Sequence, residues 1–241
     1  MRWTAFRKFK NALMVGAVLL GLSVVTEAKR SKKKRSSPKP KPTQSVPKPE
    51  PARTENMAGP FAAVVIDAGH GGHDPGGIPQ NIIPEKGVAL DVAIRLQKRL
   101  AAAGLRTVMT RTDDTFIPLG ERVRIADAEE DAIFVSVHFN SGLREAARGI
   151  ETFFGSPSSE PIAQRIHRNL LTVTENPEQR GVKHANFWVL RKTKQRAVLV
   201  ECGFLTNPDD ACVALDEGYR ETLATQIAAA LVEYRNSLSG G

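Results

Sequence analysis

Cysteine and long apolar runs are both scarce in this sequence of 241 residues. Its two cysteines, Cys202 and Cys212, are too few for a disulfide framework or a four-thiolate metal site. No internal repeat is visible. The content of 41% hydrophobic and 25% charged residues is that of a globular protein, which excludes a fully disordered chain.

Acidic residues are nearly absent from the first quarter of the chain. Residues 1–60 contain 14 Lys and Arg but only three acidic residues, whereas the rest contains 20 basic and 23 acidic residues. The net charge of +8 therefore belongs to the first quarter, and the remainder is mildly acidic. A nucleic-acid partner is not expected, because the basic part of the chain cannot form a core and the candidate catalytic residues lie in the mildly acidic remainder.

The longest apolar run, Ala12–Val25, has 14 residues and follows a basic start. As a helix it would span about 21 Å, short of the ~30 Å core of a bilayer. Small residues at Thr26 and Ala28 suit a signal peptidase, so we interpret residues 1–28 as a cleaved export signal rather than an anchor. The basic run 29–35 opposes translocation. Contact with a membrane is expected only through this segment, if it stays uncleaved.

Residues 29–60 are predicted to form a basic, disordered linker. Seven of the 15 prolines fall here, some alternating with lysines. Proline removes backbone donors and the lysines repel one another, so this segment should be extended. It is either a solvated tether or a weak adhesive for an anionic polymer such as teichoic acid, lipid headgroups or nucleic acid.

Residues 61–241 are predicted to be a single catalytic domain of the α/β class. Apolar runs typical of buried strands alternate with stretches of helical periodicity. This alternation predicts a mostly parallel, twisted sheet with helices on both faces. Strands are expected at 62–67, 105–110, 132–137, 149–154, 187–190 and 197–200, and helices at 84–104, 118–130, 159–173 and 219–238.

Side chains that can bind a metal or move protons stand at the ends of three predicted strands. His70 follows the first strand, His138 ends the third and Glu201 ends the last, while Glu85 lies in the first turn of a helix. A parallel sheet brings such ends together. Two histidines and a carboxylate suit a catalytic zinc, and a second carboxylate must then carry protons. Glu201 suits this second role, because a buried carboxylate without a partner is costly.

Other interpretations of the glycine-rich loop are weaker. Gly69-x-Gly71 has Asp74 where a dinucleotide-binding loop needs its third glycine, and no helix follows directly. His70 and His73 could both be ligands, but the helical two-histidine zinc motif is absent. We leave His73, and likewise His167 and His184, outside the metal shell.

From about Val64 to Leu238 the chain resembles the zinc-dependent N-acetylmuramoyl-L-alanine amidases of bacterial cell walls. The order and spacing of the motifs match across the whole predicted domain. The matching stretches are Ile66-Asp67-Ala68-Gly69-His70-Gly71-Gly72, Asp74-Pro75-Gly76, Glu85-Lys86, Thr110-Arg111-Thr112-Asp113, Leu119 with Arg122, Ser136-Val137-His138-Phe139-Asn140, Gly149-Ile150-Glu151-Thr152, Arg180-Gly181-Val182-Lys183, Val189-Leu190-Arg191 and Val200-Glu201-Cys202-Gly203-Phe204-Leu205-Thr206-Asn207.

The resemblance implies one zinc ion held by His70, Glu85 and His138, with Glu201 as the catalytic carboxylate. The implied reaction is hydrolysis of the amide between the lactyl group of N-acetylmuramic acid and L-alanine in peptidoglycan. The enzyme is expected to be exported to the periplasm or cell wall and to be a monomer.

Asn140 and Arg180 are expected to contact the substrate, although solvated structural roles are an alternative for both. Two rival functions stay open. One is another zinc peptidoglycan hydrolase, a carboxypeptidase, and the other is a non-catalytic module that binds the wall.

Overall fold

The computed structural model describes residues 60–77, 83–173 and 180–239. The predicted export signal, 1–28, and all of the predicted linker but Pro60 lie outside these residues. Within the described ranges, no helix combines the length and the apolar character needed to cross a membrane.

The domain is built on a six-stranded sheet with the order β2-β1-β3-β6-β4-β5. All neighbouring strands are parallel except β4 and β6, which are antiparallel. The predicted mostly parallel sheet is therefore confirmed. The strands are β1 (Ala63–Ala68), β2 (Arg106–Met109), β3 (Ala132–Asn140), β4 (Glu151–Phe154), β5 (Val182–His184) and β6 (Arg196–Phe204).

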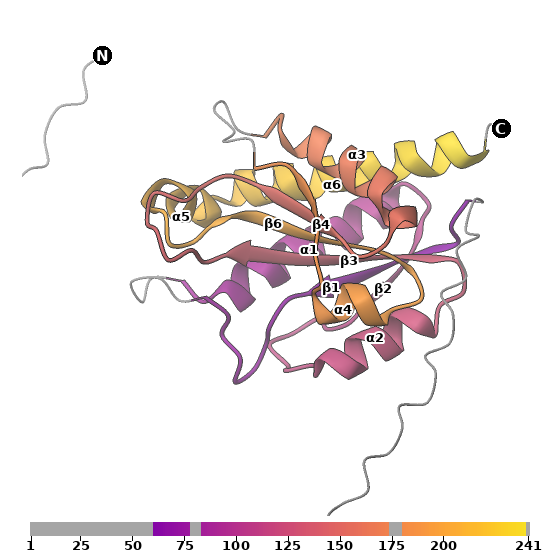
Figure 1. Cartoon of the computed structure of the whole chain (residues 1–241), viewed down its shortest axis with the longest axis horizontal. Helices are drawn as coiled ribbons and strands as arrows, with labels where there is room; N and C mark the ends of the chain where they lie inside the picture. The colour runs from indigo at the N-terminus through magenta and orange to yellow at the C-terminus, as the bar shows by residue number, and fades with distance from the viewer. Residues whose placement is uncertain (1–59, 78–82, 174–179, 240–241) are drawn as a thin grey trace, which may run out of the picture. The chain divides into compact units, whose positions relative to one another are not determined.

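Helices cover both faces of the sheet, as predicted, with α3 and α6 on one side and α2 and α4 on the other (Figure 1). Because strand side chains alternate, Val64 and Ile66 of β1 join a core with α1, α3 and α6, whereas Ala63 and Val65 join a smaller core with α2 and α4. The helices are α1 (Glu85–Ala102), α2 (Leu119–Asp127), the short 3-10 helix η2 (Pro157–Ser159), α3 (Glu160–Leu170), α4 (Trp188–Lys192), α5 (Pro208–Leu215) and α6 (Glu217–Ser239).

One predicted strand is wrong. The apolar run 187–190 forms the start of helix α4 and not a strand. Val189 and Leu190 are buried as neighbours, while Phe187 and Trp188 are both exposed. A strand with one exposed face would bury alternate residues, whereas two exposed residues followed by two buried ones fit a helical turn. A four-residue apolar run fits either a helix or a strand, so its composition alone could not distinguish between the two.

Besides the short 3-10 helix η2, two elements were not predicted. Strand β5 has only three residues and pairs with β4 alone, so it leaves little periodicity in the sequence. Helix α5 did carry a signal: the Asn207 side chain accepts hydrogen bonds from the backbone N–H groups of Asp209 and Asp210, and Pro208 is the first helical residue. An asparagine cap followed by proline is a recognised helix start.

Two buried arginines hold the end of β1 and the loop that follows it. Arg122 of α2 forms an ion pair with Asp67 and donates hydrogen bonds to the carbonyl groups of Ala68 and His70, each at 2.7 Å. Arg111 donates to the carbonyl groups of Ala68, at 3.0 Å, and Gly69, at 2.6 Å. Asp67 also accepts hydrogen bonds from two buried hydroxyl groups, those of Thr110 and Ser136. The loop that carries His70 is therefore fixed through its backbone.

Replacing Arg122 with Met should leave the carboxylate of Asp67 buried without its charge partner. Removing one member of a buried ion pair typically costs about 3–5 kcal/mol, so urea unfolding should show a loss of this size. The matched control is Arg124→Met on the same helix, where the side chain is 68% exposed and no measurable change is expected. Equal, small effects of the two substitutions would contradict this role of Arg122.

Candidate metal centre and active site

The polar groups of the site continue the face of the sheet that α2 and α4 cover. On β3, Phe134 packs in the smaller core, and Ser136 and His138 follow on the same face. On β6, Leu199 packs there and Glu201 follows. His138 and Glu201 are direct partners in the parallel pairing of β3 with β6. The strand register therefore places these two side chains next to each other.

His70 lies in a strained turn after β1. Its φ angle is 60°, in the left-handed region that residues other than glycine rarely adopt. Gly71 and Asp74 close the turn through two backbone hydrogen bonds, and Nδ1 of His70 lies 2.9 Å from Oδ2 of Asp74. Such a conformation costs about 1 kcal/mol or more and persists where the surroundings hold it. The carboxylate orients the ring so that Nε2 faces the site.

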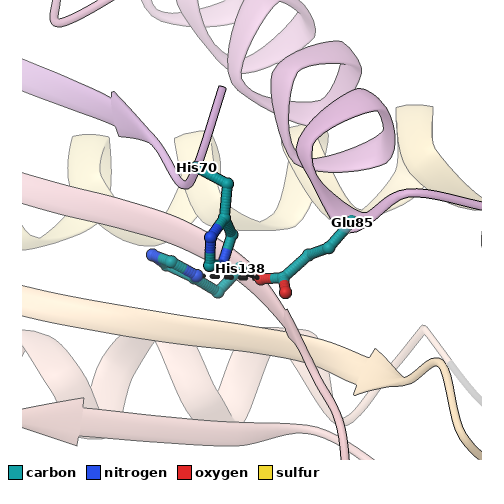
Figure 2. A group of neighbouring side chains, drawn as sticks. All are labelled: His70, Glu85 and His138. Atoms are coloured by element: carbon teal, nitrogen blue, oxygen red, sulfur yellow. Dashed lines mark hydrogen bonds and ion pairs between the residues drawn. The ribbon is translucent and has the colours of Figure 1, made fainter. Parts of the chain in front are cut away.

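His70, Glu85 and His138 converge on one point from three different elements (Figure 2). Oε1 of Glu85 lies 3.0 Å from Nε2 of His70 and 2.8 Å from Nδ1 of His138. The three side chains offer ligand atoms that all lie within 4.8 Å of one another. Two atoms bound to one tetrahedral zinc at about 2.0–2.1 Å are about 3.3 Å apart. The group fits a metal ion of this size and could hold one.

Two glycines make room for these side chains. A Cβ atom on Gly69 would lie 2.6 Å from Nδ1 of His138. A Cβ atom on Gly76 would lie 2.6 Å from Oε2 of Glu85 and 2.7 Å from Cδ2 of His70, and the φ angle of Gly76 is +69°. Real Cβ atoms do not approach this closely. The ligands can therefore take these positions only because the neighbouring backbone carries no side chain.

Charges within the group stabilise its ionised forms in the metal-free protein. Burial would raise the pKa of Glu85, but the hydrogen bonds and positive charge of His138 and His70 outweigh it and hold that pKa well below its usual range. Burial likewise lowers the pKa of His138, yet the hydrogen bond and charge of Glu85 raise it to about 9. A carboxylate that contacts two imidazole rings is an arrangement in which a cation can take the place of protons.

The pKa of Glu201 is shifted in the opposite direction to that of Glu85. Burial raises the pKa of its carboxyl group to about 7, and the negative charge of Glu85 adds to the effect of burial. Its Oε2 atom is buried and has no hydrogen-bond partner among the described residues. Glu201 lines a cavity of about 550 Å³ together with all three members of the metal-binding group. An unpartnered carboxyl group that titrates near neutral pH suits a group that takes up and releases a proton.

Asn140 and Arg180 meet at a buried carboxylate, Glu151, which sequence analysis did not single out. Nδ2 of Asn140 donates to Oε2 of Glu151 at 2.9 Å, and Nε of Arg180 donates to Oε1 at 2.8 Å. Lys183 also forms an ion pair with Glu151. Glu151 is paired with Glu201 across β4 and β6. Asn140 lines the cavity, whereas Arg180 is not among its lining residues.

The other three histidines do not join the metal-binding group. His73 packs against Phe116 with the two rings tilted, and His184 contacts the ring of Phe154. His167 is buried, with Nδ1 3.3 Å from the hydroxyl group of Thr152.

Three side chains that could bind a metal, beside a buried carboxylate at the carboxyl end of a mostly parallel sheet, are the arrangement of a metal-dependent hydrolase. The family model for N-acetylmuramoyl-L-alanine amidases matches residues 64–233. The chain therefore belongs to the N-acetylmuramoyl-L-alanine amidase family. The family and the class of enzyme predicted from the sequence are both confirmed.

Relatives and solved structures agree with this assignment. The chain is 37% identical over 175 residues to the uncharacterized protein YqiI of Bacillus subtilis (strain 168), covering 71% of this chain and 84% of YqiI. It is 35% identical over 175 residues to the N-acetylmuramoyl-L-alanine amidase LytC of the same organism, covering 71% of this chain and 35% of LytC. It thus spans about a third of the length of LytC.

Among solved structures, the chain is similar to the catalytic domain of CwlV, an N-acetylmuramoyl-L-alanine amidase from Bacillus (Paenibacillus) polymyxa var. colistinus. The TM-score is 0.70 at 35% sequence identity, and the match covers 73% of this chain and 99% of that domain.

The raised pKa of Glu201 predicts a pH-dependent stability of the metal-free protein. The pKa rises from 4.5 to about 7 on folding, so the folded state holds the proton more tightly. This contribution is complete below pH 4.5 and is lost as the pH rises through about 7. Relative to Glu201→Gln, the metal-free wild type should therefore lose up to about 3 kcal/mol of stability over this range.

Urea unfolding with a chelator at several pH values measures this loss. The same substitution at the exposed Glu130 is the control. A difference between wild type and Glu201→Gln that does not change with pH would overturn the assignment.

Gly69→Ala should displace His138 from the metal-binding group, because the added Cβ atom takes the space of the imidazole ring. We expect zinc affinity, measured by competition with a chromophoric chelator, to fall at least about tenfold. Gly87→Ala is the control, since a Cβ atom there would meet nothing within 4 Å. Equal zinc affinities in the two variants would show that His138 is not a ligand.

Proposed function

We propose that this chain hydrolyses the amide bond between the lactyl group of N-acetylmuramic acid and L-alanine in peptidoglycan. The family supports an amidase. The observation that carries the proposal is that Glu201, a buried carboxyl group without a hydrogen-bond partner, shares one cavity with His70, Glu85 and His138. This cavity offers both a place for a cation and a group that can transfer protons.

His70, Glu85 and His138 would hold one Zn²⁺ ion, which supplies a Lewis acid that polarises a carbonyl group and lowers the pKa of water. Glu201 accepts a proton from the attacking water molecule as the general base. It then donates that proton to the nitrogen of L-alanine as the C–N bond breaks, because an unprotonated amide nitrogen is a poor leaving group. One carboxyl group performs both steps because it carries the proton from the water molecule to the leaving nitrogen.

The residues around Glu201 position it for this exchange. Glu151 lies beside it in the sheet and is itself held by Arg180, Lys183 and Asn140. Arg180 and Lys183 place two positive charges against the carboxylate of Glu151, next to Glu201. Asn140 lines the cavity and, with Arg180, is proposed to contact the substrate.

Peptidoglycan lies outside the cytoplasm, so the proposal requires export. We propose that residues 1–28 direct export, that residues 29–60 tether the enzyme, and that it acts as a monomer in the periplasm or cell wall. The basic composition of the tether and the apolar run before it support this view.

Glu201→Ala should lower the rate of peptidoglycan cleavage by about 10²–10⁴-fold, the usual contribution of a general acid–base group. The zinc content should stay at one ion per chain, because Glu201 lies outside the proposed ligand set. His138→Ala is the complementary variant and should lose both zinc and activity. Turnover is measured by the release of stem peptides from purified peptidoglycan, with and without a chelator.

The new chain ends identify the reaction. Free lactyl and L-alanine ends are expected, whereas released D-alanine would identify a carboxypeptidase. Wall binding without any new ends would identify a non-catalytic module. Wild-type release of stem peptides by Glu201→Ala would falsify the role of this residue.

A further inference from the structure

One wall of the active-site cavity is apolar although it faces solvent. Of the six exposed large hydrophobic side chains in the described part of the chain, three line this cavity: Leu119, Phe187 and Trp188. Their exposed fractions are 52%, 40% and 37%. Phe116 and Ile117 extend the same lining. Exposed apolar groups that gather in one cavity, beside catalytic groups, indicate a ligand-binding surface.

This wall is rigid. Trp188 is the first residue of α4, and its ring lies over the start of α2, where Cη2 is 3.8 Å from the position of a Cβ atom on Gly120. Phe187 packs edge-to-face on Phe153 of β4, with the ring centres 5.1 Å apart and the planes at 84°. Both rings are thus packed against neighbouring elements, which reduces the side-chain ordering that a ligand would have to impose on binding.

Much of the remaining lining is polar. It holds the metal-binding group, Asp74 and Glu201. The cavity therefore combines charged groups for chemistry with an apolar, largely aromatic wall. A ligand that fills it must carry a scissile polar bond close to a neutral body with apolar faces.

We propose that Phe187, Trp188 and Leu119 form a platform for the pyranose ring of N-acetylmuramic acid. This inference rests on the proposed function. The lactyl group is attached directly to the sugar ring, so the ring must lie within a few bonds of the scissile carbonyl carbon. A pyranose ring is uncharged and presents C–H groups on its faces, which aromatic side chains bind well. The ionised groups of a stem peptide would instead be desolvated against such a wall.

Binding of the sugar on this platform positions the lactyl amide over the metal-binding group. Contacts with a part of the substrate that does not react then contribute to the rate of the chemical step. The sugar is therefore expected to raise kcat/KM beyond the value for the bare lactyl amide, and the platform is expected to produce much of that gain.

The test compares two soluble substrates with the same stem peptide. One carries N-acetylmuramic acid, and the other carries only the D-lactyl group on L-alanine. For the full chain loaded with zinc, the ratio of the two kcat/KM values measures the gain that the sugar provides. Trp188→Ala should reduce this ratio about five- to tenfold, and Trp188→Phe should retain most of it. Leu215→Ala, which removes an exposed apolar side chain outside the cavity, should leave the ratio unchanged.

A ratio that is the same in wild type and Trp188→Ala would overturn the platform, even if both enzymes cleave both substrates. General damage to the fold lowers both kcat/KM values together and so cannot mimic the predicted loss. If the wild type cleaves neither substrate, the proposed function fails, and the platform fails with it.

Discussion

The site depends on two buried guanidinium groups that bind the backbone of residues 68–70. Arg111 and Arg122 donate hydrogen bonds to three consecutive carbonyl groups at the end of β1, and Asp67 compensates the charge of Arg122. These contacts hold His70 in a backbone conformation that it would not adopt alone. They also place Gly69 directly against the imidazole ring of His138. These backbone contacts thus give the loop a preorganisation that loops normally lack.

The unequal covering of the two sheet faces creates room for the chemistry. The larger core is covered by long helices, α1 with 18 residues and α6 with 23, whereas α2 and α4 on the other face have nine and five. The short helices cover only part of that face, and His138 and Glu201 lie on it beyond the smaller core. Because side chains alternate along a strand, the same alternation that builds both cores also turns the reactive groups toward the open side.

The main parts of the site were predictable because buried strands that run into His70, His138 and Glu201 leave few other uses for these side chains. The three proposed ligands lie close together in the structure, and Glu201 lines the same cavity. What the sequence could not reveal depends on distant contacts. The carboxylate of Glu151 forms an ion pair with Lys183, which lies on the three-residue strand β5. The orientation of His70 depends on a turn closed by Asp74. The run 187–190 was wrongly predicted as a strand, and its two exposed rings became part of the cavity wall only through the helical conformation of α4.

The central claim is that His70, Glu85 and His138 hold one zinc ion next to Glu201. Anomalous diffraction at the zinc edge, from crystals of the zinc-loaded enzyme, tests this claim most directly. The account predicts a single strong peak between Nε2 of His70, Nδ1 of His138 and the carboxylate of Glu85, with Glu201 outside the coordination sphere. A peak bound through Glu201 or Glu151, or a site without His138, would contradict it.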